Sequence, residues 1–112
     1  MSNYSRGEVV LIRYPFSDLS GAKIRPAIII NAPHPSVDVL IVPLTSKITS
    51  LLPGEFVLKN WSQAGLNVQS AVKRGIYTVQ DTLIIKNVGQ ISDADLMTLD
   101  LSLRQWLGIA KQ

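Results

Sequence analysis

The chain has 112 residues, of which 46% are hydrophobic and 17% charged, a composition typical of one folded globular domain over residues 1–112. It contains no cysteine and one histidine, which excludes disulfide frameworks, thiol nucleophiles, thiolate metal sites and paired-histidine chemistry within the chain. The formal net charge of +3 suits an acidic partner such as a nucleic acid, although a charge of this size does not require one.

The first residues of the chain lack the apolar segment of a signal peptide, and the apolar runs are far shorter than a membrane-spanning helix. We therefore expect a cytoplasmic protein without a membrane partner. The eight acidic residues are scattered along the sequence without a close carboxylate cluster, which argues against a metal-dependent nuclease. We expect neither a metal ion nor a cofactor.

Three apolar, β-branched stretches in the first half of the sequence predict three strands. They cover residues 7–14, 25–32 and 37–44. The continuous run Ala27-Ile28-Ile29-Ile30 in the second stretch is typical of a strand that is covered on both faces.

The second half of the sequence predicts further short strands. Residues 55–59 form one, residues 69–79 form a longer one, and residues 82–91 carry the last. Gly75, inside the longer stretch, indicates a bulge or the close approach of another backbone. Strands that follow one another without helices between them favour an antiparallel sheet curled into a small barrel.

The end of the chain predicts an α-helix. Ser92 followed by Asp95 has the spacing of a helix N-cap and its acidic partner. Leucines then recur at helical spacing, at positions 96, 99 and 103. We expect this apolar stripe to pack in the core or in an interface. The predicted fold is therefore mainly β, a small antiparallel barrel with a C-terminal helix.

Arg25 is the first candidate for a site. Pro26 disfavours the helical conformation at Arg25 and directs it into an extended one, at the end of a polar loop that Gly21 allows to turn. The guanidinium, with five donors in a planar fork, then lies at the mouth of a strand, which suits an anion or phosphate. The alternative is that Arg25 caps a sheet edge and pairs with Asp18.

A second candidate follows the third strand, where Thr45, Ser46 and Lys47 stand in a row. Two hydroxyl groups and an ammonium group could hold a phosphate through donors and a point charge. The alternative is that the two hydroxyls form local hydrogen bonds within a turn.

Four motifs, taken together in their order and spacing, carry a family resemblance over roughly residues 6 to 108. They are Arg6-Gly7-Glu8-Val9-Val10, Ser20-Gly21-Ala22-Lys23-Ile24-Arg25-Pro26-Ala27, Val42-Pro43-Leu44-Thr45-Ser46-Lys47 and Val88-Gly89-Gln90-Ile91-Ser92 before a leucine-rich helix. With them the chain resembles the MazF/PemK family of toxin-antitoxin endoribonucleases. The resemblance implies an SH3-like antiparallel barrel with a C-terminal helix, a homodimer, and a cognate antitoxin protein as partner.

The resemblance also implies an activity and the residues for it. Such proteins cleave single-stranded RNA at short sequences without a metal ion, and they leave a 2′,3′-cyclic phosphate and a 5′-hydroxyl. Carried over by position, the catalytic residues are Arg25 and Thr45. Ser20 lies in the loop that covers the site in these proteins. From the residues themselves, the candidates for substrate contacts are Lys23, Ser46, Lys47, Lys73 and Arg74.

Arg25 suits charge stabilisation better than proton abstraction, because an arginine side chain stays protonated at physiological pH. We expect it to stabilise the charge on the phosphate and Thr45 to orient the phosphate. One position departs from the family pattern: Arg74-Gly75 stand where many relatives carry an acidic or amide pair. Neither the cleavage sequence nor the activity itself can therefore be carried over directly. The alternatives are an inactive SH3-like binding module, an inactive RNA-binding relative, or a gyrase-directed toxin of the same barrel type.

Overall fold

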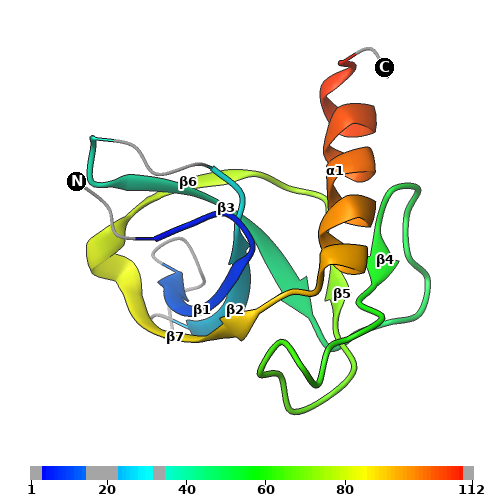
Figure 1. The fold of residues 1–112 in the computed structure, drawn as a ribbon, viewed down its shortest axis with the longest axis horizontal. Coiled ribbons are helices and arrows are strands. Elements are labelled where there is room, and N and C mark those ends of the chain that lie inside the picture. The colour runs from blue at the N-terminus through cyan, green and yellow to red at the C-terminus, as the bar shows by residue number, and fades with distance from the viewer. Residues whose placement is uncertain (1–3, 15–22, 32–34, 110–112) are drawn as a thin grey trace.

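The structure, a computed structural model, describes residues 4–14, 23–31 and 35–109 (Figure 1). Within these residues it contains seven strands, one short 3₁₀-helix and one α-helix. Their bounds in chain order are β1 Glu8–Tyr14, β2 Lys23–Ile29, β3 Asp38–Thr45, β4 Phe56–Val57, β5 Ala71–Val72, β6 Tyr77–Gln80, η1 Asp81–Leu83, β7 Ile84–Gln90 and α1 Asp93–Leu107.

The strands pair antiparallel in the order β4-β5-β3-β2-β1-β7, and β6 pairs with β3 beside this path. The long strand β3 takes three partners along its length: its first residues pair with β6, its middle residues with β2, and Leu44 and Thr45 with β5. The sheet curls strongly, and α1 stands beside it on the side of β4 and β5 (Figure 1). The predicted barrel-like antiparallel fold with a terminal helix is confirmed, although no pairing among the described residues closes β4 onto β7.

The predicted strand over residues 69–79 is wrong, because the chain breaks it into β5 and β6. The backbone N–H of Arg74 donates to Glu55 Oε2 at 2.9 Å instead of to a neighbouring strand. Gly75 follows at a φ of 155°, and Tyr77 then pairs with Ile41, away from the end of β3 that β5 occupies. The break therefore moves the chain from one part of β3 to another.

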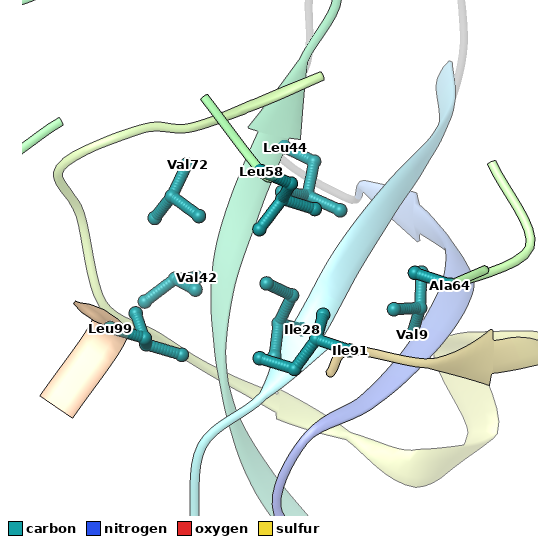
Figure 2. Packing of buried hydrophobic residues seen from close by; sticks show 9 residues of the cluster. All are labelled: Val9, Ile28, Val42, Leu44, Leu58, Ala64, Val72, Ile91 and Leu99. Atoms are coloured by element: carbon teal, nitrogen blue, oxygen red, sulfur yellow. The ribbon is translucent and has the colours of Figure 1, made fainter. Parts of the chain in front are cut away.

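Two apolar clusters lie on opposite faces of the sheet, because side chains alternate along each strand. Val9, Ile28 and Val42 belong to one cluster, which α1 covers through Leu99 (Figure 2). The other cluster contains alternate positions on β1, β2 and β3 together with Val79 of β6; its residues are Val10, Ile12, Ala27, Ile29, Val39, Ile41 and Val79. Residues Ala27–Ile29 are fully buried. The predicted cover on both faces is thus confirmed for Ala27–Ile29, whereas the first three residues of β2 are exposed.

Helix α1 begins as predicted at Ser92, whose Oγ accepts a hydrogen bond from the Asp95 backbone N–H at 3.2 Å. The buried carboxylate of Asp95 in turn accepts hydrogen bonds from the backbone N–H groups of Lys59 and Asn60, at 2.8 and 2.9 Å. The first turn of the helix therefore holds the start of the 59–70 loop.

Among the described residues, no helix combines the length and the hydropathy needed to cross a membrane.

Candidate functional site

A groove of about 850 Å³ opens where β2, the end of β3, the 65–70 loop and β7 meet. We call it the groove from here on. Its polar lining residues come from all four segments and are Arg25, Thr45, Ser46, Lys47, Asn67, Ser70, Lys86 and Asn87. The structure thus brings four of the predicted site residues together and adds four that the sequence reasoning missed.

Arg25 reaches the groove from β2, where it lies opposite Ile12 of β1 and is followed by Pro26 opposite Leu11. It is exposed, and its Nη1 donates to the Ile24 carbonyl oxygen at 3.3 Å. Asp18, the alternative partner for this arginine, lies outside the described residues. Within the described residues Arg25 forms no salt bridge, so its guanidinium can turn toward an anion in the groove.

Thr45 enters from the last position of β3, opposite Ala71 of β5. Its Oγ1 accepts a hydrogen bond from the Lys47 backbone N–H at 3.1 Å. The alternative reading of Thr45, Ser46 and Lys47, a local hydrogen bond within a turn, is therefore correct for the Thr45 hydroxyl. Because it uses the hydroxyl oxygen only as an acceptor, the O–H remains able to donate to a ligand. The turn also sets the exposed Ser46 and Lys47 at the side of the groove.

The wall that carries Asn67 and Val68 is a loop, and two glycines hold it against β7. A Cβ on Gly65 would lie 2.0 Å from the Val88 carbonyl oxygen, and one on Gly89 would lie 2.2 Å from the Ala64 carbonyl oxygen. Side chains at either position would push the two backbones apart. The Leu58 N–H also donates to the Ser70 oxygen at 2.9 Å, so both ends of this wall are anchored.

Lys86 and Asn87 line the groove from β7. The pairing of β7 with β1 shifts register twice, between Val9 and Val10 and again between Leu11 and Ile12. Between the two shifts Lys86 pairs with Leu11 and Asn87 with Val10, and the three consecutive residues of β7 from Ile85 to Asn87 are all exposed. Regular strand alternation in the sequence could not have found both groove residues, and nothing in the sequence marks Asn67 or Ser70.

The other predicted contact residues lie elsewhere. Ser20 lies outside the described residues. Lys23 is exposed at the first position of β2 and does not line the groove. Lys73 and Arg74 do not line it either; they stand at the break between β5 and β6 beside Glu55, where Lys73 Nζ is 3.8 Å from Glu55 Oε2.

Glu55 organises that break. Its side chain is only 2% exposed, and its carboxylate accepts hydrogen bonds from the backbone N–H groups of Arg74 and Leu52. These two bonds, in that order, lower the pKa of Glu55; burial opposes them and the charge of Lys73 adds to them. The carboxylate is thus a structural anchor of the 52–74 region.

The charge of the groove has one sign. Of the described residues that line it, Arg25, Lys47 and Lys86 are cationic and none is acidic. The described part of the chain contains no group of three or more His, Asp or Glu side chains that could hold a metal ion. Cations, hydroxyl groups and amides along one groove suit a phosphodiester strand, because cations and hydroxyls bind phosphates and amides can pair with base edges.

The sequence matches the family model described as PemK-like, MazF-like toxin of type II toxin-antitoxin system over residues 5–107. A comparison with curated proteins gives no match.

Solved structures share the fold. An endoribonuclease in complex with its cognate antitoxin, from a mycobacterial species, has 17% sequence identity and a TM-score of 0.76, covering 97% of this chain and 99% of that one. The Mycobacterium tuberculosis toxin MazF-mt6 has 17% identity and a TM-score of 0.75, covering 93% and 99%. A MazE–MazF structure from Deinococcus radiodurans has 15% identity and a TM-score of 0.78, covering 98% and 100%. At such low identities, the similarity shows a shared fold.

Proposed function

The chain belongs to the family of PemK-like, MazF-like toxins of type II toxin-antitoxin systems, and on that premise we propose that it is an endoribonuclease that cleaves single-stranded RNA in the groove. The observation that carries the proposal is the meeting of Arg25 and Thr45, twenty residues apart in sequence, in one groove that has cationic but no acidic described lining residues. A binding module without chemistry has no need of this pair.

The proposed reaction is an internal phosphoryl transfer. The 2′-oxygen of a ribose loses its proton and bonds to the adjacent phosphorus, while the bond from phosphorus to the 5′-oxygen breaks and that oxygen takes up a proton. The products are a 2′,3′-cyclic phosphate and a 5′-hydroxyl. Arg25 stabilises the charge on the non-bridging oxygens, an effect worth about 2.7–4 kcal/mol per well-placed donor. Thr45 donates its O–H to the same phosphate and orients it.

The rest of the groove suits a single strand. Lys47 and Lys86 lie on different segments of its lining and are available to the phosphates on either side of the cleaved one. Ile24 and Val68 are 46% and 54% exposed in the same groove, and their apolar surfaces suit the faces of unstacked bases. A duplex keeps its bases stacked, and the reaction needs them splayed. The predicted contacts of Lys23, Lys73 and Arg74 require RNA that extends past the groove.

The proposal includes two protein partners. One of the similar structures is an endoribonuclease bound to its cognate antitoxin; by extension, an acidic antitoxin segment would neutralise this chain by occupying the cationic groove. A homodimer is proposed from the family resemblance. Met97 and Leu101, 68% and 52% exposed on α1, are apolar residues that such a contact could cover. A cytoplasmic location follows from the proposed substrate and stays a prediction.

The test is incubation of a long single-stranded RNA with the purified protein in excess EDTA, followed by mapping of the product ends. Cleavage at discrete sites with 5′-hydroxyl ends is expected for the wild type and is expected to fall at least 100-fold for Arg25→Ala. Arg104→Ala is the matched control, because Arg104 is exposed on α1 and does not line the groove. A folded wild type that leaves the RNA intact would favour the binding module or the gyrase-directed toxin.

A further inference from the structure

Arg13 is a cation of β1 to which the proposed reaction gives no role. It is exposed and does not belong to the lining of the groove. It takes part in neither of the two salt bridges that the described residues form. An exposed guanidinium without an acidic partner is available to an anion. The position of Arg13 in the sheet determines which anion it can reach.

The register of β1 with β2 determines the face of the sheet on which Arg13 lies. The two strands pair without a shift over six consecutive residues, and Arg13 lies opposite Ile24. Both irregularities in the pairing of β1 with β7 place the extra residue in β7, so the side chains of β1 alternate regularly. Ile12 is buried in the same cluster as Val10. Arg13 is therefore on the opposite face, together with Leu11.

That face continues the floor of the groove. Leu11 lines the groove and pairs with Lys86 of β7 on one side and with Pro26 of β2 on the other, and both partners line the groove as well. The next pair along this face is Arg13 with Ile24, whose exposed side chain also lines the groove. Because directly opposite residues have Cβ atoms about 4.5–5.5 Å apart, Arg13 stands at the end of the groove, beside an apolar surface.

Arg13 and Lys86 are thus two cations on one face of the sheet. Arg13 is two residues beyond the partner of Lys86, which sets their Cα atoms roughly 8 Å apart, from about 3.4 Å per residue along a strand and about 4.8 Å between strands. Both side chains are long, so they can bind two different phosphates of one strand. Cations that follow the backbone of a nucleic acid beside surfaces that accept its bases are typical of single-strand binding.

Arg25 directly follows Ile24, and alternation along β2 sets the two side chains on different faces. Arg13 therefore does not share the phosphate that Arg25 contacts. We propose that Arg13 binds one further phosphate of the RNA, at the end of the groove, and that the base of the same nucleotide packs on Ile24. This inference rests on the proposed function and adds a nucleotide subsite to it. Arg13 is a binding residue and takes no part in the chemistry.

Binding and chemistry should respond differently to Arg13→Ala. Loss of one phosphate contact reduces the slope of log affinity against log salt by about 0.7 for a single strand, which is roughly fivefold weaker binding at 0.1 M salt if affinities are equal at 1 M. KM should therefore rise about fivefold with a smaller change in kcat, whereas Arg25→Ala lowers kcat. Arg13→Lys keeps the charge and should keep the slope, which a role that needs the planar guanidinium would not allow.

The closing experiment locates the contact on the RNA. An oligomer that contains the mapped cleavage site carries a 2′-deoxy sugar at the cut, and in each member of the series one phosphate is replaced by an uncharged methylphosphonate. Affinities are measured by fluorescence anisotropy for wild type, Arg13→Ala, Arg13→Lys and Arg104→Ala. Arg104 is the control because it is an exposed arginine outside the groove.

At one phosphate other than the reacting one, the replacement should weaken binding about fivefold for wild type, Arg13→Lys and Arg104→Ala and leave the affinity of Arg13→Ala unchanged. This result would support the inference, because the contact can be lost only once. Equal losses for wild type and Arg13→Ala at every phosphate would overturn it. An equal loss of slope in Arg13→Ala and Arg104→Ala would also overturn it, since net charge alone would then account for both.

Failure of the proposed function gives a different result. If the wild type binds RNA without cutting it, the same series is made on the bound oligomer, and the comparison of wild type with Arg13→Ala still decides the inference. If the wild type cuts RNA and Arg13→Ala matches it at every phosphate, only the inference fails. A wild type that binds no RNA would overturn both.

Discussion

Gly65→Ala should destabilise the protein and open the groove. Gly108→Ala is the matched control, because it has the backbone strain without the clash. Gly65 has a φ of +88° and Gly108, at the end of α1, a φ of +70°, so alanine is strained at both positions by about 1–2 kcal/mol. At Gly65 the new Cβ would also lie 2.0 Å from the Val88 carbonyl oxygen. At Gly108 no described heavy atom lies within 4 Å of the new Cβ.

The difference between the two variants therefore measures the contact of the loop with β7. Relieving the clash at Gly65 requires a shift of at least about 1 Å, from 2.0 Å to at least the 3.0 Å that real Cβ contacts show. Overpacking of this kind costs about 1–3 kcal/mol. Gly65→Ala should thus lose about 2–5 kcal/mol in total, and its Tm should lie roughly 4–12 °C below that of Gly108→Ala.

Urea and thermal unfolding of both variants would give these values, and RNA cleavage would report on the groove. Because the displaced loop carries Asn67 and Val68, cleavage by folded Gly65→Ala should fall while that of Gly108→Ala stays near wild type. Equal stability losses in the two variants would refute the reasoning, since strain at φ alone would then account for both.

Two further predictions concern charges. The pKa of Glu55 is lowered from its ordinary value of 4.5, so its ionised form should stabilise the fold fully above about that pH, with the contribution lost as pH falls through the lower folded-state pKa. The urea midpoint difference between wild type and Glu55→Gln should therefore shrink from pH 7 to pH 3, and a constant difference would contradict this. Lys86→Ala should weaken RNA binding for all sequences and reduce the slope of log affinity against log salt by about 0.7, measured by anisotropy at several salt concentrations. Lys59→Ala, an exposed lysine outside the groove, should leave the slope unchanged.

The parts of the fold that could be predicted from the sequence are those set by local pattern. β1, β2 and β3 are apolar β-branched runs bounded by turn residues, and Ser92 caps α1 with the expected hydrogen bond. The break between β5 and β6 has another origin. It depends on Glu55, nineteen residues from Arg74, whose carboxylate takes a backbone N–H that a continuous strand would have used.

The candidate site divides in the same way. Thr45 is the last residue of β3, as the end of the apolar run indicates. The sequence predicts that Arg25 begins its strand, but β2 begins at Lys23 and Arg25 is its third residue. The sequence nevertheless indicates both residues as groove residues. Lys86 and Asn87 are consecutive residues of β7 that both line the groove, which the alternation of side chains along a strand does not predict. Asn67 reaches it because Gly65 and Gly89 let two backbones approach, a contact that joins segments distant in sequence.

The three partners of β3 bear on where this chain can change in length. One residue added to or removed from β3 would turn every following side chain to the opposite face, and it would do so against β6, β2 and β5 together. By contrast, the segment from Ile48 to Leu51 pairs with no strand and precedes the Leu52–Glu55 anchor. Inserted tags or labels, and the length differences that accumulate during divergence, should therefore be tolerated in that segment and excluded from β3.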